Sequence, residues 1–362
     1  MQICFLSLRF IDRKMARRLI VFSFLIIFTV LFAGFIQDNP YFEIHPEDVE
    51  MKIPKGFPEP LYDLKNNKIT VAEFTLGRKL FYDPILSKDY FTSCASCHQR
   101  FAAFAHIDHA LSHGMLGQIG KRNVPALQNL IWKDAFMADG GINHLDLQPL
   151  APLTSPIEMG ESLDTVLMKL QKDSIYPGLF KKAFGTTDIT SERLLKSLSQ
   201  FLALMVSSNS RFDKYLEGKE TFSDQETRGL NLFRTKCENC HKEPLFTDNS
   251  YRNIGLKPDS ALKDSGRAAI TGKAEDYMRF KVPSLRNVER TYPYMHDGRF
   301  RNLNEVMKHY AEGKFYTDNF DQSIQRAVGL TEQEQSDLIA FLKTLTDNTF
   351  LMDRRFADPS MR

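Results

Sequence analysis

Hydrophobic residues recur at the spacing of α-helices over much of the chain. Near the C-terminus, Leu338, Phe341, Leu342 and Leu345 follow an i, i+3, i+4, i+7 pattern, which puts them on one helical face. Residues 190–206 carry a similar stripe. Convincing alternation of apolar and polar residues, as in half-buried strands, is absent from the sequence. The pattern therefore predicts a mostly α-helical fold.

The starts of three of these helices can also be predicted. A hydroxyl residue followed three positions later by Glu forms a capping box, in which both side chains accept hydrogen bonds from free N–H groups of the first turn. The sequence contains such pairs at Thr70 and Glu73, Ser223 and Glu226, and Thr331 and Glu334. We expect helices to begin directly after residues 70, 223 and 331.

The longest apolar run lies near the N-terminus. Residues 19–36 are mostly apolar and follow the basic residues Arg13, Lys14, Arg17 and Arg18. This arrangement is typical of an export signal or a signal anchor, and about 20 apolar residues suffice to span a membrane. A buried core helix fits the basic flank poorly. Since no clear A-x-A cleavage site follows, we favour an uncleaved anchor over a cleaved signal peptide. We expect the rest of the chain to work in the periplasm, either free or tethered to the inner membrane.

Four of the five cysteines form two C-x-x-C pairs, and a histidine directly follows each pair. C-x-x-C-H is the attachment motif of c-type haem, in which both thiols bond to the porphyrin and the histidine ligates the iron. A zinc site would favour pairs about 15–20 residues apart, and a redox dithiol would favour a βαβ context. We therefore expect two covalently bound c-type haems, held by Cys94, Cys97 and His98 and by Cys237, Cys240 and His241.

The surroundings of the two motifs also repeat. A capping box and a Gly-x-x-x-Phe segment precede each motif, at residues 77–81 and 229–233, and residues 82–91 are an insertion in the first copy. We interpret this as an internal duplication that gives two cytochrome-c-like haem domains in tandem. The predicted domains are residues 46–206 and residues 207–362, after a signal and linker segment at residues 1–45. The polar residues 347–362 are expected to be loose.

The charge balance excludes one class of partner. The chain has 47 basic and 45 acidic residues and a formal net charge of +2. Nothing in this balance favours nucleic acid as a partner.

With these motifs, the sequence resembles the bacterial di-haem cytochrome c peroxidases and their MauG relatives. The resemblance runs from about Phe57 to Phe350 and rests on LGRKLFYDPILS before the first haem motif, on GKRNVPALQN and PLTSPIEMG after it, and on SNSRFDKYLEG, FKVPSLRNV and TYPYMHDGRF. It implies an active centre on the N-terminal haem.

The resemblance assigns roles to several residues. His98 would be the proximal ligand of the N-terminal, peroxide-binding haem, and His241 that of the C-terminal, electron-transferring haem. Glu158 matches the distal carboxylate of the family and Gln148 its distal glutamine. Peroxide cleavage requires a proton to move from one oxygen to the other, which a carboxyl group above the iron can do. In the absence of these motifs, a lone Glu in a Pro-rich loop would be read as a solvated side chain.

The resemblance also implies a calcium ion between the domains. The side chain of Asn123 and the backbone carbonyls of Thr291 and Pro293 match the family's ligands, and oxygen ligands of this kind suit Ca²⁺. The alternative for Asn123 is a turn-stabilising side chain. His296 matches a family histidine near this junction, without a sharper role.

The sequence has its own features at the C-terminal haem. Fourteen residues beyond His296 lies Tyr310, where family peroxidases usually carry Met and MauG-like members carry Tyr. We expect Tyr310 to be the distal iron ligand, with Met307, one helical turn earlier, as the alternative. A thioether ligand raises the haem potential, whereas a tyrosinate favours oxidised iron.

The path between the haems also differs from the family pattern. Ala138 stands where family members commonly carry a Trp between the haems, and the chain's single Trp is Trp132. Fast electron exchange between the haems is therefore in doubt or is rerouted. We expect Trp132 to be a core residue, although a rearranged loop could bring it into the path.

The loop after the first haem contains His106, His109, His113 and Met115. Some family peroxidases close the resting N-terminal haem with a histidine from this loop. His113 is the best candidate, and Met115 is an alternative. We favour exposed histidines and a five-coordinate iron, as in MauG-like members.

Three functions follow from the resemblance. The favoured one is a peroxidase that reduces hydrogen peroxide to water with electrons relayed through the C-terminal haem. Its donor would be a small protein, cytochrome c or cupredoxin, or a quinol-linked donor, and homodimers are usual in the family. The alternatives are a MauG-like oxidase, which acts on a protein partner through a high-valent state of the paired haems, and a non-enzymic di-haem electron carrier.

Overall fold

The computed structural model describes residues 43–360, and helices dominate it. The two short strands β1 (Tyr251–Arg252) and β2 (Phe280–Lys281) pair antiparallel and form the only sheet among these residues. The predicted mostly α-helical fold is confirmed. The α-helices are α2 (Val71–Tyr82), α3 (Cys94–Cys97), α4 (Leu150–Thr154), α5 (Leu163–Lys172), α6 (Tyr176–Phe184), α7 (Ser191–Ala203), α8 (Arg211–Leu216), α9 (Asp224–Lys236), α10 (Ala268–Thr271), α11 (Leu303–Glu312), α12 (Glu332–Lys343) and α13 (Asn348–Met352).

The predicted signal or anchor segment lies outside the described residues. Within residues 43–360, no helix combines the length and the apolar character needed to cross a membrane.

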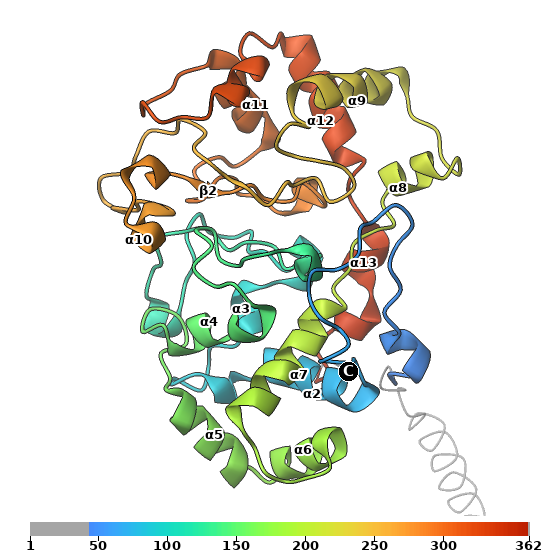
Figure 1. The fold of residues 1–362 in the computed structure, drawn as a ribbon, viewed down its shortest axis with the longest axis vertical. Coiled ribbons are helices and arrows are strands. Elements are labelled where there is room, and N and C mark those ends of the chain that lie inside the picture. Colours follow the sequence, from blue (N-terminus) through green and yellow to red (C-terminus); the bar gives the residue numbers. More distant parts are fainter. Residues whose placement is uncertain (1–42, 361–362) are drawn as a thin grey trace, which may run out of the picture. The chain divides into compact units, whose positions relative to one another are not determined.

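Two crossed helix pairs organise the two halves of the described chain (Figure 1). Helix α2 packs against α7 in the first half, and α9 packs against α12 in the second. A side chain at Gly77 would collide with the carbonyl of Ser197, and one at Gly229 would collide with the carbonyl of Asp337. Glycine is therefore needed at both crossings because it lets the helix backbones approach closely. This shared geometry supports the internal duplication.

The capping boxes form in two of the three predicted places. Ser223 with Glu226 and Thr331 with Glu334 make both reciprocal hydrogen bonds at the starts of α9 and α12. At α2 the prediction is only half right. Thr70 accepts from the Glu73 N–H, but its own N–H donates to the side chain of Gln200 on α7. The packing of α7 on α2 thus replaces the local partner.

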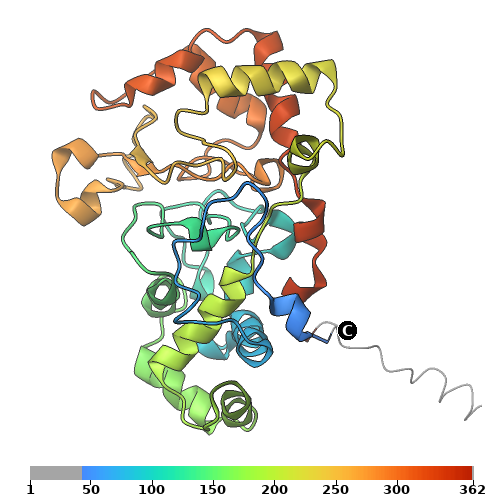
Figure 2. The same cartoon turned by 45° about the vertical axis from the view of Figure 1, so that its right-hand side comes forward.

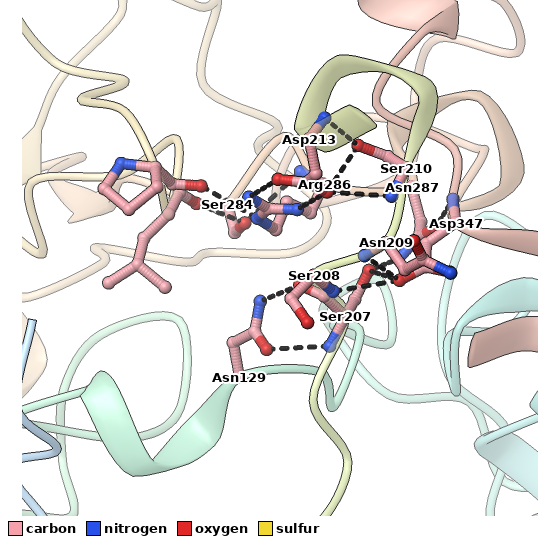
Figure 3. Close-up of polar contacts among 12 residues, drawn as sticks. Asn129, Ser207, Ser208, Asn209, Ser210, Asp213, Ser284, Arg286, Asn287 and Asp347 are labelled. Carbon is pink, nitrogen blue, oxygen red and sulfur yellow. Dashed lines mark hydrogen bonds and ion pairs between the residues drawn. The ribbon is translucent and has the colours of Figure 1, made fainter. Parts of the chain in front are cut away.

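A loop repeats between the halves and links them. Asn129 and Asn287 both adopt left-handed backbone conformations, with φ of 58° and 60°. In both copies the Asn N–H donates to a carbonyl after the second helix of the pair, and its side-chain oxygen accepts an N–H two residues further on. The partners are Met205 and Ser207 in the first half and Leu345 and Asp347 in the second. Figure 3 shows both asparagines beside the segment 207–210 that joins the halves.

The C-terminal segment is ordered and buried, so the expectation of loose residues after 347 is wrong for the described part. Figures 1 and 2 show α13 continuing from α12 to lie beside the first half of the molecule. Phe350 and Phe356 are 3% and 1% exposed. These two aromatic side chains bury enough apolar surface to fix an otherwise polar segment.

Candidate haem and peroxide site

The first C-x-x-C-H motif lies on a short helix that presents its histidine inward. Cys94 and Cys97 bound α3, and His98 follows directly. The Nδ1 of His98 lies 2.6 Å from the carbonyl oxygen of Phe104. Burial lowers the pKa of His98 to about 4, so the ring is neutral. With the proton on Nδ1, the Nε2 lone pair is left to bind a metal.

The second motif repeats this arrangement at the end of α9. Cys237 caps that helix, and Cys240 and His241 follow. The Nδ1 of His241 lies 3.1 Å from the carbonyl oxygen of Phe246 and 3.2 Å from that of Pro283. All four cysteines of the motifs are free thiols. Both sites thus offer two thiols and an oriented imidazole, which is the donor set that covalent haem requires.

A cavity of about 430 Å³ adjoins the first motif. Its lining includes Cys97, Ser96, His106, His113 and Gly114. His106 is 7% exposed, so the expectation of exposed histidines is wrong for this residue. Within residues 43–360, its Nδ1 has no hydrogen-bond partner. An apolar-walled space beside the thiols, with an unpaired ring nitrogen, fits a prosthetic group at this position.

The loop that carries Glu158 packs onto the wall of this cavity. The N–H of Met115 donates to the carbonyl of Glu158 at 2.7 Å, and the Cys97 thiol donates to the carbonyl of His113 at 3.0 Å. A side chain at Gly114 would collide with the backbone at Ile157. Glu158 is therefore held next to the thiols of the first motif, and its charge contributes to raising the pKa of Cys97.

Glu158 has the properties of a proton carrier. Burial raises its pKa, and no charged group among the described residues offsets the effect. A carboxyl group in such surroundings exchanges protons near neutral pH more readily than an exposed one. Gln148 precedes α4 and Glu158 follows it, so this helix fixes the spacing between them. The structure does not test the role of Gln148, which stays a prediction.

Tyr310 and Met307 share α11, and both contact the hydrophobic core of the second half. Met307 is 7% exposed and belongs to the hydrophobic core of the second half. Tyr310 is desolvated, which raises its pKa, and the nearby Cys237 and Cys240 add to the effect. The charges of Cys237 and Cys240 thus act on the Tyr310 hydroxyl, which places it near the second haem motif, and the Tyr310 ring also packs against the core that contains Met307.

Comparisons with known proteins agree with this geometry. Residues 71–221 match the family model of di-haem cytochrome c peroxidase, and residues 226–346 match that of cytochrome c. The chain is 35% identical to the methylamine utilization protein MauG of Methylorubrum extorquens over 81% of this chain and 82% of that protein. It is 34% identical to cytochrome c551 peroxidase of Nitrosomonas europaea over 75% and 79% of the two chains. A solved MauG-like protein associated with microbial copper homeostasis has a TM-score of 0.80 at 31% identity, covering 86% of this chain and 99% of that one.

The chain belongs to the di-haem cytochrome c peroxidase and MauG family. Membership confirms the resemblance predicted from the sequence, the two c-type haems and the oxidoreductase class with peroxidase relatives. The calcium ion, the domain limits and the roles of individual residues stay predictions.

The residues expected to bind calcium partly come together. The N–H of Asn123 donates to the carbonyl of His296 at 2.7 Å, and its side-chain amide donates to Ala110 at 2.9 Å. Within residues 43–360, the Asn123 side-chain oxygen and the carbonyls of Thr291 and Pro293 accept no hydrogen bond. Oxygen atoms of these kinds suit a hard cation, and the calcium ion stays a prediction.

Trp132 is a core residue, as expected. It is 2% exposed, its Nε1 donates to the carbonyl of Pro58 at 2.7 Å, and its ring lies edge-on to Phe57. Ala138 instead lies where the halves meet, since its carbonyl accepts the N–H of Lys281 at 2.7 Å. His113, the candidate distal ligand, stacks on His109 with ring centroids 4.2 Å apart.

Two groups at the junction of the halves were not predicted from the sequence. Arg122 pairs with Asp264 at 2.6 Å and with Asp139 at 2.5 Å, and so joins both halves. Tyr251 lies under Arg267, whose guanidinium is 3.8 Å from the ring centroid, and against Gly140. The pairing of Arg122 with Asp264 had no sequence signal, because the partners are far apart and sit in irregular loops. The repeated V-P-x-L-x-N at residues 124–129 and 282–287 could have revealed the matching loops.

Proposed function

We propose that the protein reduces hydrogen peroxide to water at the N-terminal haem, with electrons relayed through the C-terminal haem. The observation that carries this proposal is the desolvated carboxyl of Glu158, held by the loop of His113 and Met115 beside the Cys97 thiol. A pure electron carrier would have no use for a half-buried, desolvated acid at this position.

The residues of the chain divide the chemistry between them. When bound, haem would supply the site for peroxide and would pass on the two electrons that the donor provides. Glu158 would take a proton from one peroxide oxygen and return it to the other, which leaves as water. Gln148 orients peroxide through its side-chain amide. With two further protons from solvent, each peroxide gives two water molecules.

The substitution Glu158→Gln tests the role of this carboxyl group. The amide keeps the shape but cannot carry a proton, so peroxide turnover should fall by about 10²–10⁴-fold. The haem content, measured from the absorbance of the pyridine complex, should not change. Glu192→Gln, at an exposed carboxylate on α7, is the matched control and should retain full activity. Unchanged turnover in Glu158→Gln would contradict the assigned role.

A second candidate function is oxidation of a protein partner, as proposed for a MauG-like enzyme. The position of Tyr310 beside Cys237 and Cys240 favours it, because an oxygen ligand stabilises oxidised iron. Peroxide titration of the fully oxidised and the half-reduced protein separates the two functions. Turnover only after one-electron reduction supports the peroxidase. A long-lived oxidised spectrum formed from the fully oxidised protein supports the MauG-like oxidase.

The setting of the reaction is part of the proposal. We infer a periplasmic enzyme, released or held at the inner membrane by residues 1–45, because haem attachment follows export and the N-terminal sequence has the matching pattern. Its donor is a small cytochrome c or cupredoxin, or a quinol-linked protein. A calcium ion at Asn123, Thr291 and Pro293 would fix the junction of the halves. A homodimer is the expected assembly by analogy with the family.

A further inference from the structure

The chain continues beyond its second haem half and returns to the first. The match to the cytochrome c family ends at residue 346. Residues 347–356, which we call the C-terminal tail, form α13 and a short 3-10 helix at Arg354–Phe356. The tail lies beside the first half in both views (Figures 1 and 2).

The tail inserts two aromatic side chains into the core of the first half. The ring of Phe356 lies 6.3 Å from that of Phe104 and 6.1 Å from that of Phe201. The ring of Phe350 lies 6.0 Å from that of Phe104. Phe104 has no exposed surface. Its position therefore depends on side chains that come from the other end of the chain.

Hydrogen bonds fix the tail backbone in one place. Side chains of the first half donate to three backbone carbonyls of the tail. Arg100 donates to Asp353 at 3.3 Å and Arg78 donates to Arg355 at 3.3 Å. The Tyr82 hydroxyl donates to Phe356 at 2.6 Å. Because directional bonds accompany the aromatic contacts, the tail has a defined register on the first half.

Phe104 is the residue whose carbonyl accepts the Nδ1–H of His98. Ala103 and Phe104 both have left-handed backbone conformations, with φ of 54° and 59°. Consecutive non-glycine residues in this region persist only where their surroundings hold them. The aromatic contacts of the tail supply part of this restraint.

In the second half, the residue whose carbonyl faces the haem-motif histidine is held by residues of the same half. Phe246 has φ of 55°, and its carbonyl faces Nδ1 of His241. Phe212 of α8 packs on Phe246 and Phe341 at 5.1 and 5.7 Å, in addition to Phe233 of α9. Phe356 makes the corresponding contacts with Phe104 and Phe201. The first half therefore takes from the tail what the second half takes from α8.

The start of the tail is bound to the junction of the halves (Figure 3). Asp347 is 1% exposed, and its Oδ2 accepts hydrogen bonds from the Ser207 hydroxyl and from the N–H groups of Ser208 and Asn209. Its Oδ1 caps α13 at Phe350, and its own N–H donates to Asn287. The tail is thus fixed to the linker and to the second half at one end and to Phe104 at the other.

We propose that the C-terminal tail is a positioning element for the N-terminal haem, acting through the carbonyl of Phe104 on His98. This inference rests on His98 being the proximal ligand in the proposed function. A hydrogen bond from Nδ1 to a fixed acceptor strengthens the imidazole as a ligand and lowers the iron potential. The tail connects the junction of the halves to this bond, so a change at the junction reaches the catalytic iron.

Two reciprocal variants of the full-length haem protein test the proposal. Phe356→Ala should raise the midpoint potential of the N-terminal haem and lower its Fe–His stretching frequency, with the C-terminal haem unchanged. Phe212→Ala should shift the C-terminal haem and spare the other. Met352→Ala, at a tail side chain that is 68% exposed, is the matched control and should shift neither. Equal shifts of both haems in Phe356→Ala, or none, would contradict the proposal.

Tyr82→Phe keeps the test available if Phe356→Ala does not fold. It removes only the hydroxyl that binds the carbonyl of Phe356 and should give a smaller shift in the same direction. An unchanged Fe–His frequency in a folded Tyr82→Phe protein would count against the tail. The readouts are potentials and vibrational spectra, so they respond even if the protein does not turn over peroxide. A failure of the proposed function is therefore distinguishable from a failure of this inference.

Discussion

The two haem halves have the same framework but differ in the residues that surround their haem motifs. Each has a crossed helix pair with glycine at the crossing, a C-x-x-C-H motif and a carbonyl that orients the histidine. The first half adds a cavity of about 430 Å³ and the half-buried acid Glu158. The second half places Tyr310 toward its haem motif. The shared framework carries the haem motifs, and in the proposed function the additions give the two haems their different roles.

The halves also differ in how they stabilise themselves. The second half contains a buried ion pair in which Arg286, fully buried, makes a bidentate contact with Asp213 at 2.8 and 2.9 Å (Figure 3). In the repeated loop, the residue of the first half that corresponds to Arg286 is the neutral Gln128, which donates to the Arg286 carbonyl. The second half is thus stabilised by a buried ion pair of its own, whereas the first half packs against the tail.

Among the substitutions that test this difference between the halves, Asp213→Asn should have the largest effect on stability. It leaves a buried guanidinium without its counter-charge and should lower the free energy of unfolding by about 3–5 kcal/mol. Chemical unfolding, followed at the absorbance of each haem, measures the loss. The second half should unfold first, and simultaneous unfolding of both halves would contradict their separate stabilisation.

The same pair predicts a dependence on pH. Burial alone would raise the pKa of Asp213, but the hydrogen bonds and charge of Arg286 outweigh it and lower the pKa below the ordinary value of 3.8. The stabilisation is therefore complete above about pH 4 and is lost as the pH falls below that value. Acid unfolding of Asp213→Asn should be flatter than that of the wild type in this range.

Substitutions at the helix crossings should have the next largest effect. Gly77→Ala and Gly229→Ala each place a methyl group against a backbone carbonyl that cannot move freely, and should cost about 1–3 kcal/mol. Gly178→Ala in α6 is the matched control, since no atom lies within 4 Å of the added carbon. It should be neutral or stabilise the protein by up to about 1 kcal/mol. Calorimetry can compare the three variants, and equal costs would refute the close crossings.

Much of the fold was predictable because its signals are local. The haem motifs, the capping residues and the helical stripes lie within short segments of sequence. The tail was not predictable, since α13 and the following turn are too short to show a helical period and their aromatic partners lie more than 140 residues away. The hydrogen bond from the Thr70 N–H to the side chain of Gln200, in place of the expected bond to Glu73, likewise depends on tertiary packing.

The candidate site shows the same division. Glu158 and Tyr310 were found through motifs, and the structure adds their surroundings. The ion pairs of Arg122 were missed because its partners lie in irregular loops of both halves.

Tyr310→Met should have the smallest effect of these substitutions, a change in the potential of the C-terminal haem. A thioether in place of the oxygen ligand should raise the potential of the C-terminal haem on the order of 0.1 V, within the roughly 0.8 V range that axial ligands span. Spectroelectrochemistry measures this potential. Met307→Leu, a change within the core, should leave it unaltered. If Met307→Leu shifted the potential and Tyr310→Met did not, Met307 would be the ligand.

The division of roles between the halves is tested most directly by mixing the protein with one equivalent of peroxide and recording the electron paramagnetic resonance of each haem. The measurement uses the wild type and Glu158→Gln, in the fully oxidised and the half-reduced state, with Cys94→Ser identifying the N-terminal signal. We expect peroxide to change the signal of the N-terminal haem first, and Glu158→Gln to slow this spectral change by about 10²–10⁴-fold. A first response at the C-terminal haem, or an equal rate in Glu158→Gln, would contradict it.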